Sequence, residues 1–198
     1  MVFKSGCKIP FPNKINEEYM IKENGLIANV GSDKIESVMQ HFIRMNDEPF
    51  FFILELPSSA DVEEMIRPGI VEKFHKDIYY IDGCSKEEAI VIMLRVGELL
   101  FNDGLSEFGY GCHNSGDEIM FRKYNVTTIY SDKIENYSGF FEKHDINKVE
   151  NVLNAWETFT EDNPGESYKI TVNGKDVYSI PEQFSAWGIY MAEQRTDE

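Results

Sequence analysis

The sequence predicts an α+β fold, in which a mixed, largely antiparallel sheet packs with about four helices in a single domain. Helical and strand-like patterns alternate in the first half of the chain, and three short strand-like segments follow one another in the second. The 198 residues are enough to bury a substantial core, and no internal repeat or low-complexity tract is present. The turn at 163–165, Asn-Pro-Gly, is the one candidate boundary, but the segment beyond it is too small for a second domain.

The first elements follow from prolines and hydrophobic spacing. Residues 1–24 contain prolines and many polar residues, and we expect an irregular arm followed by a short strand at 26–30. Ser32 or Asp33 should cap the helix that follows, because apolar residues then recur with the period of a helix. The continuous apolar run at 49–56 predicts a central strand covered on both faces.

The next segments lead to the clearest helix. Residues 57–67 are expected to form a short acidic helix, and 76–82 a second strand. Ser85 and Glu88 have the spacing of a capping box, which predicts the start of a long helix that runs to the turn at 102–104. The broad apolar surface of this helix suggests burial on more than one side.

The middle of the chain predicts an antiparallel meander. Its three strands are expected at 105–112, 117–124 and 126–130, with a polar turn between the first two. Residues 132–143 have a mixed pattern that fits a helix or a loop. Residues 147–160 have helical spacing and are expected to form a helix.

The final segment, 166–198, is expected to be a hairpin plus a helix docked on the same core. The hairpin is predicted at 168–180, because the Asn-Gly pair at 173–174 accepts the positive φ angles of a type I′ turn. Pro181 suits the first turn of a helix, and the amphipathic pattern continues over 182–195.

Acidic residues greatly outnumber basic ones. The chain has 35 Asp and Glu against 19 Lys and Arg, for a formal net charge of −16. Binding to a nucleic-acid backbone or an anionic membrane requires clustered cations, so we expect neither nucleic-acid nor membrane binding. The acidic pairs are scattered along the sequence, which leaves open whether they are a solvated surface or gather on one face toward a basic partner.

The sequence also suggests a compartment. It begins without the apolar stretch of an export signal, and the run at 49–56 is too short to cross a bilayer. Cys7, Cys84 and Cys112 are odd in number and widely spaced, so neither a disulfide framework nor a structural zinc site is indicated. We therefore expect a cytoplasmic protein.

Familiar catalytic patterns are absent from the sequence. Cys112 and His113 are adjacent on a predicted strand and should point to opposite faces, which opposes a nucleophile and base pair. The four histidines are isolated, and the glycines around Tyr110 lead into a strand rather than a phosphate-binding helix. We expect no cofactor, no metal and no catalytic residue, and these absences favour a protein that is not an enzyme without deciding the question.

Aromatic residues and acids at strand ends are the remaining signal. Neighbouring strand residues face opposite ways, so one tyrosine of a pair such as Tyr79-Tyr80 should be exposed. A tyrosine beside a carboxylate suits a basic protein surface, because the ring supplies contact area and the carboxylate pairs with a cation. The candidate partner-binding residues are Asp77, Tyr79, Tyr80, Asp82, Tyr110, Asp117 and Glu118.

Two alternatives stay open. The strand-end carboxylates Asp77, Asp82, Asp117 and Glu118 could converge on a divalent metal in a metal-dependent hydrolase. The chain could also be a small-molecule-binding or structural protein.

In its acidity and its aromatic strands, FFFILEL at 50–56 and KDIYYID at 76–82, the chain resembles the small acidic immunity proteins that bacteria pair with polymorphic toxins. The resemblance extends over the whole chain as a profile and includes no diagnostic motif. It implies a tight one-to-one complex that blocks a basic, nuclease-like toxin, with electrostatic steering to speed capture. We therefore expect an acidic protein-binding module, an immunity or antitoxin-type inhibitor of a basic protein partner, whose oligomeric state the sequence leaves open.

Overall fold

A nine-stranded sheet dominates the structure, a computed structural model that describes residues 1–58, 64–67, 70–72 and 74–196. Neighbouring strands of this sheet are antiparallel, except for the first two in the order below, which are parallel. Across the sheet the strands are β11 (Asn147–Lys148), β2 (Glu18–Lys22), β3 (Gly25–Asn29), β10 (Val126–Tyr130), β9 (Glu118–Phe121), β8 (Glu107–Cys112), β4 (Phe50–Pro57), β7 (Lys76–Cys84) and β13 (Tyr190–Arg195).

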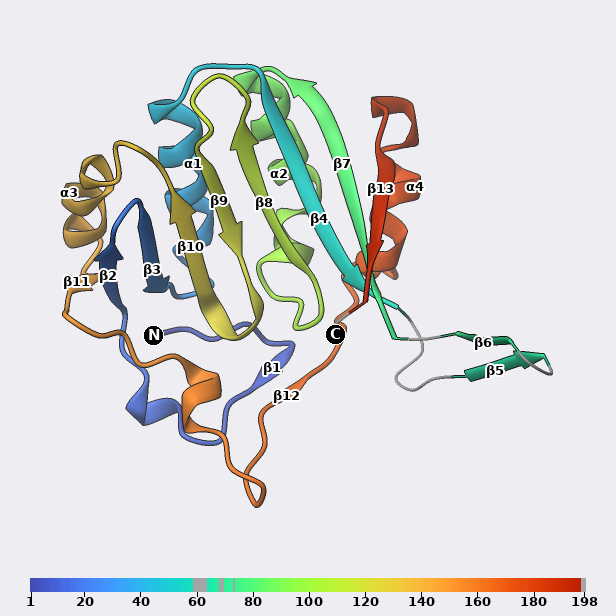
Figure 1. The fold of residues 1–198 in the computed structure, drawn as a ribbon, viewed down its shortest axis with the longest axis horizontal. Helices are drawn as coiled ribbons and strands as arrows, with labels where there is room; N and C mark the ends of the chain where they lie inside the picture. Colours follow the sequence, from blue (N-terminus) through green and yellow to red (C-terminus); the bar gives the residue numbers. More distant parts are fainter. Residues whose placement is uncertain (59–63, 68–69, 73, 197–198) are drawn as a thin grey trace.

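Four α-helices in the described residues contribute to a common core on one side of this sheet (Figure 1). They are α1 (Ile35–Met45), α2 (Lys86–Leu100), α3 (Glu135–Lys143) and α4 (Ile180–Gln183). Tyr110 of β8 illustrates the packing, because its Oη donates a hydrogen bond to the backbone oxygen of Ala89 in α2 at 2.9 Å. The chain is a single α+β domain with a mixed sheet, as the sequence predicts.

The remaining elements are short. Two further two-stranded sheets pair β1 (Cys7–Lys8) with β12 (Glu166–Ser167), and β5 (Glu64–Arg67) with β6 (Ile70–Glu72). Short 3₁₀-helices lie at Pro12–Lys14, Lys123–Asn125, Ala155–Thr158, Val177–Ser179 and Ser185–Trp187. None of the described helices has both the length and the apolar character that a bilayer crossing requires.

Hydrophobic spacing predicted the two long helices correctly. The apolar stripe of α1 is buried against the sheet, and the capping box of α2 is present: Glu88 N donates to Ser85 Oγ, and Ser85 N donates to Glu88 Oε2. The predicted caps of α1 were wrong, because the helix begins at Ile35 after Lys34 with no side-chain cap. Burial of α2 on more than one side was also wrong, since Leu94 is 73% exposed.

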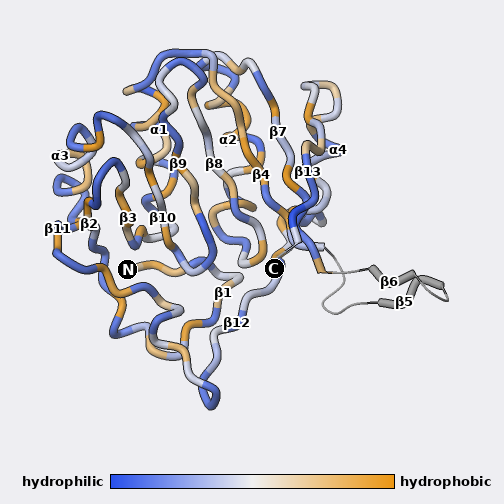
Figure 2. The backbone as a smooth tube through the Cα atoms, in the orientation of Figure 1, coloured by the Kyte–Doolittle hydropathy of each residue, from blue (hydrophilic) through white to orange (hydrophobic). Residues whose placement is uncertain are grey.

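The central strands were predicted from their composition. β3, β4, β7 and the meander β8–β9–β10 all lie within a few residues of their predicted bounds. Figure 2 shows that β4 is hydrophobic along most of its length, whereas the turn from β8 to β9 is hydrophilic. These strands make up the middle of the sheet, where apolar side chains are buried.

Several predictions for the ends of the chain were wrong. The expected arm at 1–24 includes β2, which pairs with β3. In place of the acidic helix at 57–67, β4 extends to Pro57 and β5 covers 64–67, while 59–63 lie outside the described residues. The expected helix at 147–160 is instead β11, an irregular stretch and a 3₁₀-helix, because Val149 N donates to Tyr19 O at the edge of the sheet.

The C-terminal prediction was correct for its turn and wrong for its strands. Asn173 and Gly174 have positive φ angles of 52° and 77°, as a type I′ turn requires. The flanking residues form only one bridge, between Val172 and Lys175. The expected final helix is only α4 and a 3₁₀-helix, and the chain then forms β13 against the edge of β7.

Candidate functional site

We call the side of the nine-stranded sheet that faces away from the four α-helices the open face (Figure 1). Side chains alternate along each strand, so Phe51, Ile53 and Glu55 of β4 point to this face while Phe52 and Leu54 point to the helices. The central strand is therefore covered by helices on one side only. On the other side, Ile53 is buried by neighbouring side chains of the sheet itself.

Two glycines of β8 lie on the open face. Gly111 is the cross-strand partner of Phe51, and a Cβ atom at Gly111 would come within 2.5 Å of Phe51 Cε2 and closer still to Cζ. A Cβ atom at Gly109 would overlap the backbone oxygen of Ile119 and lie 2.7 Å from Met120 Sδ. The aromatic residues of β8 thus point into the core on the helix side of the sheet. The glycines between them leave room for Phe51 and Met120 on the open face.

Four rings form a row across the open face, which we call the aromatic row. The centroid of Phe51 lies 4.6 Å from that of His113 and 5.9 Å from that of Tyr80, and Tyr80 lies 6.2 Å from Tyr190. These distances are typical of favourable aromatic pairs. The row covers a small apolar cluster of Ile53, Ile78 and Met120.

Asp82 joins the two ends of the aromatic row. Tyr190 Oη donates to Asp82 Oδ2 at 2.6 Å, and His113 Nε2 lies 3.6 Å from Asp82 Oδ1. The hydrogen bond to this carboxylate raises the pKa of Tyr190. About half of the Asp82 and His113 side chains is exposed, so both can contact a partner.

A cluster of ion pairs lies at the other end of the same face. Glu55 and Glu107 are cross-strand partners, and Lys76 Nζ lies 3.8 Å from the first carboxylate and 3.9 Å from the second. Arg122 Nη1 donates to Glu107 Oε2 at 3.0 Å, and Arg195 Nη1 lies 3.9 Å from Glu55 Oε1. Burial, and next the charge of Glu107, raise the pKa of Glu55.

Three of the predicted partner-binding residues lie on the open face. Tyr80 belongs to the aromatic row, and Asp82 contacts Tyr190 and His113 at the two ends of the row. Glu118 of β9 is the cross-strand partner of Gly111 and lies on the same face. Burial, and next the charge of Glu118, raise the pKa of Tyr80. The structure therefore brings these three residues to one surface.

Two others point the opposite way. Tyr79 packs against the main core, and Asp77 Oδ1 accepts a hydrogen bond from Gln194 Nε2 at 2.9 Å. Burial, and next the charge of Asp77, raise the pKa of Tyr79. Alternation along β7 thus places Tyr79 and Tyr80 on opposite sides, as expected for adjacent strand residues.

Tyr110 and Asp117 do not reach the surface. Tyr110 is fully buried, which raises its pKa well above the usual value. Asp117 is buried and accepts a hydrogen bond from Ser131 Oγ at 2.7 Å. In this structure Tyr110 ties β8 to α2, and Asp117 holds the end of β10 through Ser131. The four strand-end carboxylates of the hydrolase alternative accordingly have different surroundings and do not converge.

Sequence reasoning missed Phe51 and Tyr190. Phe51 belongs to a strand that was expected to be buried on both faces, and Tyr190 to a segment that was expected to be helical. The signal for Phe51 was the glycine at 111, because a strand that alternates glycine with aromatic residues leaves space on one face.

The cysteine and histidine residues do not assemble a catalytic or metal site in the described part of the chain. Cys112 is buried with its Sγ 2.7 Å from Asp47 O, while the adjacent His113 lies on the open face against Phe51. Cys84 is also buried, which raises its pKa to about 11. No group of three or more His, Cys, Asp or Glu side chains among the described residues could hold a metal ion.

No family model matches the chain, and neither the curated proteins nor the solved structures compared with it include a match.

Proposed function

We propose that this protein binds a basic protein partner through the open face and inhibits it in the manner of an immunity protein or antitoxin. The observation that carries the proposal is the aromatic row with carboxylates beside it. Tyr80 and Tyr190 lie next to Asp82, and Glu118 lies on the same face, on β9.

The composition of this surface suits a cationic protein. Tyrosine rings provide large, rigid contact areas that are enriched in binding hot spots, and carboxylates beside them pair with lysine or arginine. Tyr190 is 46% exposed, and Asp82 keeps about half of its side chain exposed beside it. A partner that covers the row would bury apolar area and bring its cations to these acids.

The net charge of −16 supports the same proposal through long-range attraction. An excess of negative charge speeds encounter with a positively charged protein, and salt screens this attraction over about 10 Å at moderate ionic strength. The association rate with the partner should therefore fall steeply with added salt. We expect this interaction in the cytoplasm.

The test combines co-purification with matched variants. The tagged protein, expressed in its native host, is isolated with its partners, which are identified by mass spectrometry. The open-face variant carries Tyr190→Ala and Asp82→Asn. The control carries Leu94→Ala and Glu87→Gln on α2, which likewise removes one exposed large side chain and one negative charge.

We expect a basic partner that the wild type and the α2 control retain and the open-face variant loses, with an association rate that falls with salt. Thermal unfolding of all three proteins verifies that each is folded. The proposal would be refuted if only acidic partners or no partners were recovered. It would also be refuted if the α2 control lost the partner while the open-face variant retained it.

A further inference from the structure

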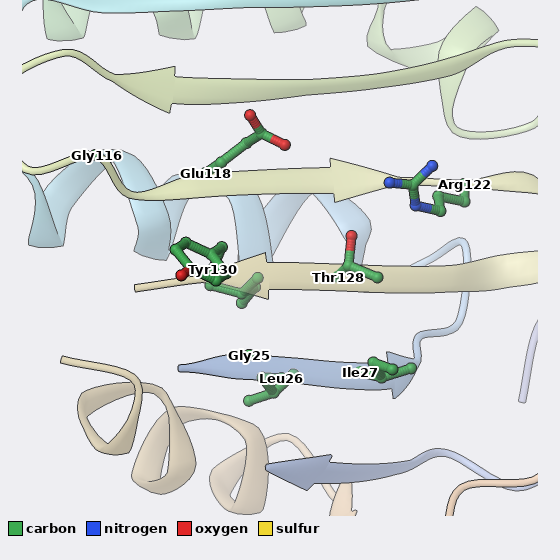
Figure 3. Close-up of a pocket in the computed structure, with 9 residues that line it drawn as sticks. Gly25, Leu26, Ile27, Gly116, Glu118, Arg122, Thr128 and Tyr130 are labelled. Carbon is green, nitrogen blue, oxygen red and sulfur yellow. The ribbon is translucent and has the colours of Figure 1, made fainter. Parts of the chain in front are cut away.

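A hollow of about 370 Å³ lies on the open face beside the aromatic row, over β3, β10 and β9 (Figure 3). Its volume is near the lower end of the range for ligand pockets, about 300–1,000 Å³, and fits a single side chain. Figure 3 shows Glu118 and Arg122 at the two ends of β9, with Tyr130 and Gly25 at the Glu118 end.

Glu118 differs from the other carboxylates in the middle of this face. Glu55 and Glu107 each lie within 4 Å of cations of the chain itself. Within the part of the chain that the structure describes, no hydrogen bond or ion pair holds the Glu118 carboxylate. Its charge is therefore available to a cation from outside.

The surroundings of Glu118 suit the rest of a long cationic side chain. Tyr130 is the cross-strand partner of both Glu118 and Gly25, so its side chain projects from the same face as that of Glu118. In Figure 3 the Glu118 carboxylate lies over β9 on the side of β8, and Tyr130 lies across β9 from it. The Tyr130 side chain is 59% exposed, and Gly25 and Gly116 leave the adjoining space free of side chains. Half-buried Ile27 supplies apolar area for a methylene stem.

Arg122, at the far end of the hollow, does not oppose a cation at Glu118. Its guanidinium is already paired with Glu107 at 3.0 Å. The two ends of the hollow thus differ: Arg122 is paired with Glu107, whereas Glu118 has no such partner among the described residues.

We propose that this hollow receives one lysine or arginine side chain of the partner, with its charged end between the Glu118 carboxylate and the Tyr130 ring. The inference rests on the proposed function and gives it a defined contact. A carboxylate and an aromatic face together recognise a cation, and a neutral side chain of the same length lacks both interactions.

The hollow can be tested with small probes. Nα-acetyl-lysine amide and Nα-acetyl-arginine amide are titrated into the isotope-labelled protein, with Nα-acetyl-norleucine amide as the neutral control. We expect the two cationic probes to shift the backbone amide signals of Gly25, Gly116 and Tyr130 in a saturable way, and the neutral probe to leave them unchanged.

Matched variants assign the binding to Glu118. Glu118→Gln should weaken binding of the cationic probes at least tenfold, whereas Glu87→Gln on α2, with the same change in net charge, should leave it unchanged. Equal binding by both variants, equal shifts with the norleucine probe, or no saturable shifts at the hollow would overturn the inference.

The proposed function and this inference fail in different experiments. If partner capture depends on Tyr190 and Asp82 but Glu118→Gln changes neither capture nor probe binding, the hollow is excluded and the proposed function stands. If the probes bind at Glu118 but no basic partner depends on the open face, the proposed function fails and the cation site is independent of it.

Discussion

The ring of Phe51 occupies the space that a side chain at Gly111 would need. The two residues are direct cross-strand partners on β4 and β8, and a Cβ atom at Gly111 would come within 2.5 Å of Phe51 Cε2. The ring in turn lies between His113 and Tyr80. The geometry of the aromatic row therefore depends on a missing side chain in the neighbouring strand.

Gly111→Ala should force the Phe51 ring out of the row. We expect a loss of about 1–3 kcal/mol in the free energy of unfolding, the usual range for an overpacked site, and weaker partner binding. Urea unfolding measures the first effect. Gly139→Ala in α3 is the control, because a Cβ atom there meets nothing within 4 Å, and this variant should be unchanged or slightly more stable. Equal stability of the two variants would contradict the prediction.

Lys4→Met should stabilise the fold. The Lys4 side chain is almost fully buried, and among the described residues its Nζ has no hydrogen-bond partner. Methionine of similar length removes this buried polar group, and we expect a gain of about 1–3 kcal/mol. The same substitution at exposed Lys8 is the control and should bring no such gain.

The gain at Lys4 should also depend on pH. Burial lowers the pKa of Lys4 from its usual 10.5. Between the lowered value and 10.5, the unfolded chain binds a proton that the folded chain does not, so the free energy of unfolding of the wild type rises with pH. The advantage of Lys4→Met should be largest at low pH and shrink as pH approaches 10.5. The urea midpoints of the wild type and Lys4→Met, measured from neutral to alkaline pH, test this. A difference between the two proteins that does not change with pH would argue against a lowered pKa for Lys4.

Glu55→Gln and Glu107→Gln should have opposite effects. The pKa of Glu55 is raised above its usual 4.5. At a pH between 4.5 and this raised pKa, the folded chain keeps a proton on Glu55 that the unfolded chain has released. The free energy of unfolding of the wild type therefore falls as pH rises through this interval, and Glu55→Gln should remove that decline and be at least as stable at neutral pH.

Glu107→Gln weakens the charge-assisted bond from Arg122 and should cost about 1 kcal/mol at neutral pH. Chemical unfolding of both variants over a pH series distinguishes the two carboxylates. If Glu55→Gln lost as much stability as Glu107→Gln, the ion pairs of Glu55 would stabilise the fold by more than burial of its charge destabilises it.

Ser85→Ala should destabilise the start of α2. The substitution removes the acceptor for Glu88 N, and we expect a loss of about 1 kcal/mol. Thermal unfolding measures the total effect, and hydrogen exchange should show it concentrated in the first turn of the helix. Protection unchanged in that turn would be inconsistent with a working cap.

Local patterns predicted the middle of the sheet and failed at its edges. A central strand such as β4 needs an apolar composition, and a helix such as α2 needs a cap and a 3.6-residue period, so both are readable from short segments. β13 was missed because its conformation comes from pairing with β7, and its six residues are all exposed. An edge strand gains its hydrogen bonds from a distant neighbour, which no local window contains.

The candidate site divides in the same way. Tyr80, Asp82 and Glu118 were identified because acids and tyrosines in strands are visible in the sequence. Tyr110 and Asp117 satisfy the same pattern but are buried, since the face that each side chain occupies depends on sheet register. The aromatic row needs four strands in register, so its membership could not be inferred from one segment.

Tyr190 and Asp82 are 108 positions apart in the chain, and β13 follows every other strand of the sheet in chain order. On the ribosome, β7 is therefore made long before the strand that covers its edge, and until then its backbone groups are open to pairing with other chains. The aromatic row is complete only after β13 has been synthesised and docked. A partner recognised through this row would be neutralised by the finished protein and not by its nascent chain.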